Sequence, residues 1–191
     1  MQKSRRSRWS LGFTLTEIAV VTALVSSVPA ASYVRAKKKA YQTQCANNLM
    51  NIGRMLMMYQ LENDCYPKAA FYPKDPAKGQ DSIRVILGGD PRLWICPGLP
   101  KKIQQKGLSF VYNTNIAGKR NLRNPHKKWV LIEVNCVSKK APPPHPGGYN
   151  ILFADGHVIA SKVLPRRIMG IQRAQIRRLE KQFQEMYAQA E

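Results

Sequence analysis

The first 34 residues divide sharply into a basic stub and an apolar run, and this switch constrains the fold more than any other feature. Residues 1–12 carry four Lys and Arg side chains and no acid, whereas residues 13–34 carry one charged side chain, Glu17. A basic segment before an apolar one stays in the cytoplasm while the following chain is exported. The apolar run is long enough to span a bilayer if its Thr and Ser residues are tolerated. We therefore predict a basic leader at 1–12 and a transmembrane or filament-core helix at 13–34.

Glu17 distinguishes this segment from an ordinary signal peptide. An acid inside a membrane helix costs about 2.5–3.5 kcal/mol on insertion scales, so it usually has a partner and a function. Small residues near Ala31 would also suit an ordinary signal-peptide cleavage site, and plain secretion with cleavage there is the alternative.

The stretch GFTLTE at residues 12–17 resembles the cleavage and methylation motif of type IV prepilins and type II secretion pseudopilins. The resemblance implies that a prepilin peptidase cuts after Gly12 and that the new amino terminus of Phe13 is methylated. It also implies that Glu17 pairs with this amine on a neighbouring subunit. Such a pair is physically reasonable, because opposite charges in a low dielectric lower each other's burial cost.

Later stretches are similar to a secretion-pseudopilin branch of the same family. They are QCANNL at 44–49, NDCYP at 63–67, WICP at 94–97 and YNILFADGHV at 149–158. The resemblance is extensive up to about residue 66. Beyond that residue it is confined to the two short segments 94–97 and 149–158.

Helical spacing continues beyond the apolar run. Cys45, Leu49, Ile52, Leu56 and Tyr59 recur at intervals of four and three, which indicates one buried helical face. The pattern predicts a helix that reaches about residue 61.

The second half of the chain reads as strands and turns. Candidate strands lie at 108–113, 129–134, 149–154 and 157–161, and the Asp155-Gly156 pair between the last two predicts a type I′ hairpin. The predicted fold class is therefore α+β, with a long N-terminal helix on a small antiparallel sheet. The head is expected to span 35–165.

Residues 166–191 form a predicted amphipathic helix with a basic face. It is expected to fold back on the head with that face in solvent. A docking helix for an acidic or membrane partner is the alternative.

Four cysteines in an exported domain predict disulfides. Four cysteines allow three connectivities. We favour Cys45 with Cys96, which would tie the helix to a loop layer, and this leaves Cys65 with Cys136. Free buried thiols are the alternative if the compartment is reducing.

No metal, cofactor or catalytic site is expected. Several side chains have zinc-ligating atoms but lack the close paired spacings of structural zinc sites; they are Cys96, His126, Cys136, His145 and His157. Asp155 alone cannot supply the six to eight oxygens that calcium takes.

Charge suggests a further class of partner. The chain has 31 Lys and Arg against 11 Asp and Glu, and 27 of these cations remain without the leader. Such an excess attracts nucleic acid or another polyanion.

The leading prediction is a structural subunit of a type II secretion pseudopilus or type IV pilus-like filament. Its expected partners are copies of itself or related pilins, the prepilin peptidase, inner-membrane assembly machinery and, before assembly, membrane lipid. Its head would lie in the periplasm until it joins a periplasmic or surface filament. The alternatives are a DNA- or polyanion-binding minor pilin, and a membrane-anchored secreted protein or enzyme that forms no filament.

Overall fold

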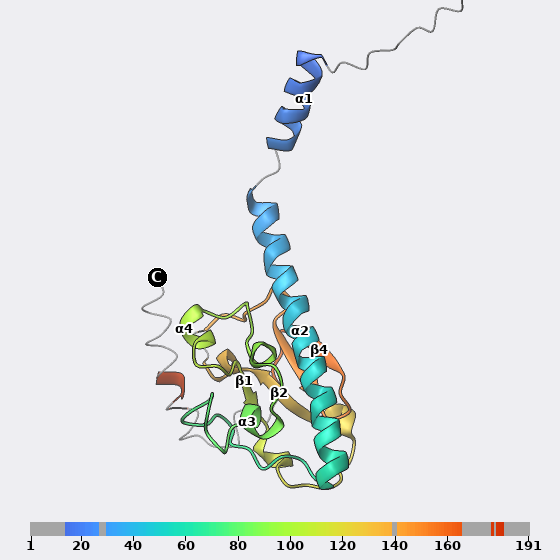
Figure 1. The fold of residues 1–191 in the computed structure, drawn as a ribbon, viewed down its shortest axis with the longest axis vertical. Coiled ribbons are helices and arrows are strands. Elements are labelled where there is room, and N and C mark those ends of the chain that lie inside the picture. The colour runs from blue at the N-terminus through green and yellow to red at the C-terminus, as the bar shows by residue number, and fades with distance from the viewer. Residues whose placement is uncertain (1–13, 27–29, 139–140, 166–176, 178, 182–191) are drawn as a thin grey trace, which may run out of the picture. The chain divides into compact units, whose positions relative to one another are not determined.

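The structure is a computed structural model of the 191-residue chain, and it describes residues 14–26, 30–138, 141–165, 177 and 179–181 (Figure 1). The chain divides into two compact units, residues 1–36 and residues 37–191. Each unit is described by itself.

The first unit contains helix α1, Leu15–Ser26, and the start of helix α2, Ala30–Asn63. Among the described residues, no helix combines the length and the apolar character needed to cross a lipid bilayer. The described part of the helix predicted at 13–34 consists of α1, which has 12 residues, and the first residues of α2. Residues 13 and 27–29 of that prediction lie outside the described residues.

Helix α2 ends close to the predicted place. It continues to Asn63, and the next residue, Asp64, has φ 55°, a left-handed conformation that stops the helix. Its buried face is the predicted one, because Cys45, Leu49 and Ile52 are fully buried.

The second unit is built on an antiparallel sheet of four strands in the order β1-β2-β3-β4. The strands are β1 Phe110–Tyr112, β2 Trp129–Glu133, β3 Tyr149–Phe153 and β4 Val158–Ser161. Each lies within one of the four predicted runs, so the α+β class and the small antiparallel sheet are confirmed. Every residue of β1 and β2 is buried, whereas β4 is a partly exposed edge strand.

The hairpin between β3 and β4 is confirmed, but its predicted turn type is wrong. A type I′ turn needs positive φ at two residues, and here Gly156 has φ 88° while Asp155 is not left-handed. The Gly156 amide donates to the Phe153 carbonyl at 2.9 Å, and the Phe153 amide donates to the His157 carbonyl at 2.9 Å. The connection is thus a three-residue loop in which only one position needs glycine.

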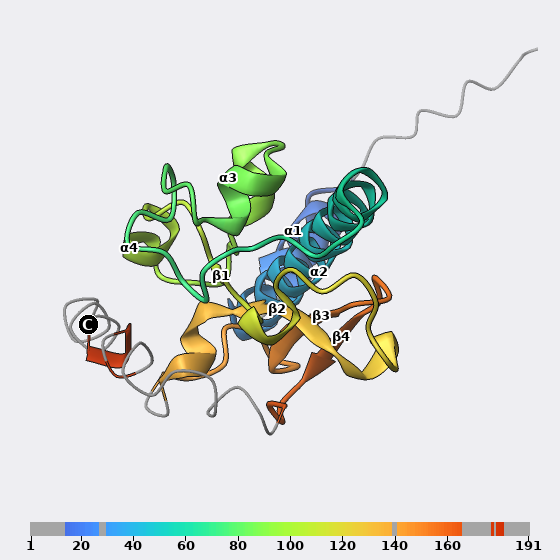
Figure 2. The same cartoon turned by 90° about the horizontal axis from the view of Figure 1, so that it is seen from below.

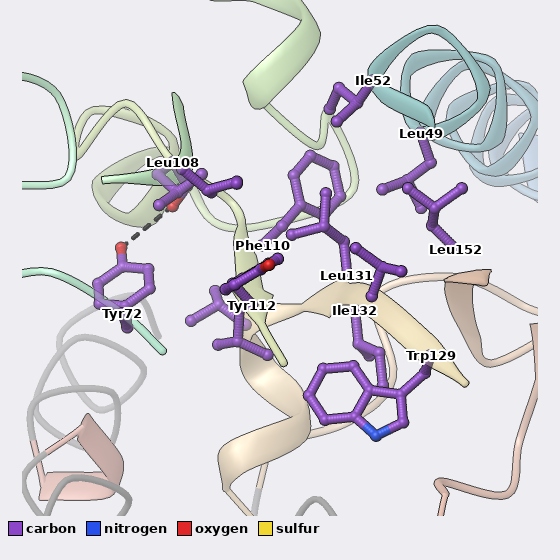
Figure 3. Packing of buried hydrophobic residues seen from close by; sticks show 14 of the residues in the cluster. Leu49, Ile52, Tyr72, Leu108, Phe110, Tyr112, Trp129, Leu131, Ile132 and Leu152 are labelled. Atoms are coloured by element: carbon purple, nitrogen blue, oxygen red, sulfur yellow. Dashed lines mark hydrogen bonds between the residues drawn. The ribbon is translucent and has the colours of Figure 1, made fainter. Parts of the chain in front are cut away.

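Helix α2 and the sheet share one hydrophobic core. A Cβ built at Gly53 would lie 3.1 Å from the Leu152 Cδ1 atom, so α2 lies close against β3. Figure 3 shows Leu49 and Ile52 of α2 in the same cluster as Leu131 and Leu152 of the sheet. Burial of these side chains is the main stabilising term available to the head.

The segment between α2 and β1 forms a layer beside β1 (Figure 2). It holds the short helices α3, Ile83–Leu87, and α4, Lys101–Gln104, and the 3-10 helix η1, Pro91–Trp94. Backbone amides join this layer to β1, since the Tyr112 amide donates to the Phe71 carbonyl at 2.9 Å. In Figure 3 the Tyr72 hydroxyl reaches the Leu108 carbonyl, at 3.0 Å.

Three further 3-10 helices lie in the connections of the sheet: η2 Thr114–Ile116, η3 Pro125–Lys127 and η4 Val134–Val137. The predicted C-terminal helix falls mostly outside the described residues. Its Leu179 belongs to the buried core and is 5% exposed.

Candidate functional site

Of the predicted processing and assembly residues, Gly12 and Phe13 lie outside the described residues, and Glu17 stands in the first turn of α1. Its carboxylate accepts hydrogen bonds from the Thr14 amide at 2.8 Å and the Thr14 hydroxyl at 2.9 Å. The Glu17 amide in turn lies 3.3 Å from the Thr14 hydroxyl oxygen, which accepts from it. Thr14 precedes the first helical residue, so the pair forms a capping box. The structure thus gives Glu17 a local role at the start of α1.

The apolar side chains of α1 are exposed on several sides of the helix. Leu15, Ile18, Val20 and Val21 are each more than half exposed. At about 100° of rotation per residue, these four positions spread around the whole helix. A helix that is apolar all round is normally covered on all sides. In the described part of this chain the apolar side chains of α1 are left uncovered.

A second group of side chains lies buried inside the head. It consists of Cys45, Cys96, Glu133 and His145, and we call it the Cys–Glu–His cluster. One ligand atom from each residue lies within 4.8 Å of the others. All four residues are buried.

Four different segments supply the cluster. Cys45 lies on the buried face of α2, Cys96 follows η1, and Glu133 is the last residue of β2. His145 precedes β3, where it forms an isolated bridge with Gly148. Pairing of β2 with β3 and packing of α2 on the sheet bring these segments together.

Short polar contacts connect the cluster. The Cys45 thiol donates to Glu133 Oε1 at 3.2 Å, and His145 Nε2 lies 3.3 Å from the same oxygen. His145 Nε2 also lies 3.2 Å from the Cys96 sulfur. These contacts compensate part of the cost of burying a carboxylate in the core.

Surrounding groups fix the orientation of the Glu133 and His145 side chains. The backbone amide of Asn150 donates a hydrogen bond to Glu133 Oε2 at 2.6 Å, which leaves Oε1 to face the other residues of the cluster. A Cβ at Gly98 would lie 2.6 Å from His145 Cε1, so only glycine leaves room for the imidazole. His145 Nδ1 has no hydrogen-bond partner within the described part of the chain.

The contacts shift the ionisation of three cluster members. Burial raises the pKa of Cys45 well above its usual value, and its contacts with Cys96 and Glu133 add to this. The hydrogen bond between Cys96 and Cys45 lowers the pKa of Cys96 to about 7. Burial acts in the opposite direction, and the contact with His145 also lowers this pKa. Burial alone would lower the pKa of His145, but its contacts with Cys96 and Glu133 prevail and raise it to about 9.

All four cysteines carry free thiols in the structure, so neither predicted disulfide is formed. The predicted neighbours Cys45 and Cys96 do lie together in the cluster. Cys65 is half-buried beyond the end of α2, and Cys136 is buried in η4, where burial raises its pKa.

The zinc-type residues considered from the sequence separate into two groups. Cys96 and His145 meet in the cluster, whereas His126, Cys136 and His157 are not part of it. Sequence reasoning missed Cys45 and Glu133 as members. A signal for Glu133 was present, because it is the one acid at the end of the apolar strand WVLIE.

Asp155 has a local structural role in the turn between β3 and β4. Its carboxylate contacts His157 Nδ1 in the same turn, and the His157 ring stacks on Phe153 with ring centroids 4.5 Å apart. The Asp-Gly-His sequence is thus explained by the hairpin.

The head also carries an exposed basic loop. Residues 119–128 contain five Lys and Arg and no acid, and every one of these cations is exposed. Lys119, Lys127 and Lys128 line a hollow beside Trp129.

No match was found when the chain was compared with models of known families, with curated proteins and with solved structures. The resemblance of residues 12–17 to prepilins is therefore neither supported nor opposed by relatives.

Proposed function

We propose that this chain is a structural subunit of a type II secretion pseudopilus or type IV pilus-like filament, processed after Gly12 by a prepilin peptidase. The observation that carries the proposal is helix α1, which is capped at its start and exposes apolar side chains on all sides. Such a helix needs a cover in every direction. Lipid provides that cover before assembly, and the helices of neighbouring copies provide it afterwards.

The GFTLTE motif supports the same proposal. Cleavage after Gly12 leaves Phe13 and Thr14 directly before the first residue of α1, Leu15. The new amine is then within a few residues of the carboxylate of Glu17 on the same chain, and a neighbouring subunit that is axially shifted brings its own amine to this level. Apolar burial between helices and this ion pair drive assembly, while an assembly ATPase elsewhere supplies the work.

Mass spectrometry of the mature amino terminus tests the proposal. We expect a chain that begins with N-methylated Phe13. A mature chain that begins beyond Ala31 would show plain secretion and would remove α1 from the final product.

The exposed basic loop at 119–128 favours a second candidate, binding of DNA or another polyanion by the same subunit. Five exposed cations without an acid within ten residues carry the positive charge that neutralises phosphates in polyanion binding, and this supports the second candidate. The test is a gel shift of double-stranded DNA by the full-length chain at increasing salt. Binding that weakens steeply with salt supports this candidate, and no shift at low salt rejects it.

A further inference from the structure

The Cys–Glu–His cluster places ionisable side chains inside the hydrophobic core of the head, where such side chains are unusual. Two thiols, a carboxylate and an imidazole lie together in the interior of the head, and three contacts of 3.2–3.3 Å join their four ligand atoms. Sulfur, nitrogen and carboxylate oxygen are the three ligand types that proteins use for zinc.

We propose that Cys45, Cys96, Glu133 and His145 bind one zinc ion as a closed structural site. The ion would tie α2, the loop after η1, the end of β2 and the segment before β3 to one another. This function is separate from filament assembly, because it belongs to the head and uses no residue of α1.

The spacing of the ligand atoms fits a tetrahedral ion. Bonds of about 2.0–2.3 Å from zinc to nitrogen, oxygen and sulfur place the ligand atoms of a regular tetrahedron about 3.3–3.8 Å apart. The separations in the structure are 3.2 Å from Cys45 Sγ to Glu133 Oε1, 3.2 Å from Cys96 Sγ to His145 Nε2, and 3.3 Å from His145 Nε2 to Glu133 Oε1. All remaining separations are at most 4.8 Å. Small movements of the four side chains would admit the ion.

The ligand atoms already point at one another. Glu133 Oε2 is occupied by the Asn150 amide, so Oε1 is the oxygen that faces the two sulfurs and the imidazole. The absence of a side chain at Gly98 fixes the place of the His145 ring. Such supporting contacts are what orients the ligands of a metal site.

The charges of the site suit a divalent cation. Zinc binding displaces one proton from each thiol to solvent, and a protonated His145 gives up its Nε2 proton as well. Two thiolates and one carboxylate then carry three negative charges against two on the ion. The hydrogen bond that the Asn150 backbone amide donates to Glu133 Oε2 compensates part of the remaining single negative charge.

A disulfide between Cys45 and Cys96 is the competing outcome. The two sulfurs are close enough for oxidation to be a realistic alternative in an exported head. Oxidation removes both thiolates, so the disulfide and the zinc site exclude each other. The oxidation state of this pair in protein taken from its own compartment is therefore a direct test.

The first experiment uses the unmodified full-length chain, isolated without reductant or chelator. We expect one zinc per chain by elemental analysis and two unmodified cysteines at positions 45 and 96 by non-reducing peptide mapping. A disulfide between these two residues, or a reduced chain that takes up no zinc from equimolar solution, overturns the proposal.

Cobalt substitution identifies the ligands without relying on variants. Cobalt(II) at this site should show the intense visible bands of tetrahedral coordination and a thiolate-to-cobalt charge-transfer band with the intensity of two thiolates. An octahedral spectrum, or one without thiolate bands, contradicts the proposed ligands.

Matched variants then locate the site. Cys96→Ser and His145→Gln should lose most of the bound zinc, whereas Cys65→Ser and His126→Gln, which change the same residue types outside the cluster, should keep it. Zinc retained by the first pair, or lost equally from the control pair, overturns the assignment. If a cluster variant fails to fold, the cobalt spectrum of the unmodified chain decides.

Discussion

At the scale of single residues, Glu17 combines two roles that one substitution can separate. The structure shows it closing a capping box with Thr14, and the prepilin resemblance gives it a charge-pairing role between subunits. A glutamine at this position of a capping box serves almost as well as a glutamate, but it has no charge.

We therefore predict that Glu17→Gln and Glu17→Ala are both cleaved after Gly12 and both fail to enter filaments. The reason is that both lack the charge that pairs with the neighbouring amine. Incorporation is measured as the fraction of subunit in purified filaments, and cleavage by mass spectrometry of the same samples. If Glu17→Gln assembles like the unmodified chain while Glu17→Ala does not, capping is the relevant role and the ion pair is not needed.

Gly98 is a second residue whose role can be tested alone. Because a methyl group there would overlap the His145 ring, Gly98→Ala should displace the imidazole without removing any ligand. Displacing the support of a ligand typically costs about 10–100-fold in metal affinity. Competition with a chromophoric chelator measures the zinc affinity of the variant, and an affinity equal to that of the unmodified chain would contradict the proposed geometry.

At the scale of elements, the sequence predicted what depends on local periodicity. The face of α2 from Cys45 to Leu56 and all four strands were predictable, because buried positions recur every three to four residues in the helix and apolar runs mark the strands. The Cys–Glu–His cluster was not predictable. Its members lie between positions 45 and 145 in four separate segments, and the pairing of β2 with β3 and the docking of α2 bring these segments together.

The hairpin turn was likewise predictable in its position but not in its type. Asp155-Gly156 correctly predicted a reversal between two strands, but the turn type depends on the register, in which Leu152 pairs with Val158. That register leaves three loop residues between Phe153 and His157, so the two-residue type I′ turn does not form.

The packing of α2 on the sheet leads to a prediction about stability. Leu49→Ala should lower the free energy of unfolding of the head by about 2–5 kcal/mol, because Leu49 is fully buried and the variant leaves a cavity. Met58→Ala on the same helix is the control, since Met58 is 61% exposed and its loss should cost within about 0.5 kcal/mol. Urea denaturation of both variants measures the difference, and equal effects would mean that α2 does not pack as described.

At the scale of the whole molecule, the large positive charge is not spread evenly, because the loop at 119–128 carries five cations and no acid. If this loop binds DNA, replacing Lys127 and Lys128 by Gln should lower the slope of log affinity against log salt by about 0.9 for each phosphate contact that is lost. The control is the double replacement of Lys101 and Lys102 by Gln, which changes the net charge equally at another exposed place on the head. Equal effects of the two double variants would show that net charge, and not this loop, determines binding.

A zinc ion in the head would couple metal binding to the stability of the whole second unit, because its four ligands come from elements that separate on unfolding. An ion that binds only the folded state at 100 times its dissociation constant adds about 2.7 kcal/mol to the free energy of unfolding. For a chain of this size each kcal/mol raises the melting temperature by about 2–4 °C, so a strong chelator should lower it by about 5–11 °C. Differential scanning calorimetry with and without chelator measures the shift in melting temperature. We expect the shift in the unmodified chain and in Cys65→Ser. In Cys96→Ser the chelator should have no effect. A chelator that leaves the melting temperature of the unmodified, zinc-loaded chain unchanged would mean that the ion is not held by the folded core. The cluster would then be only a set of buried polar groups that stabilise one another.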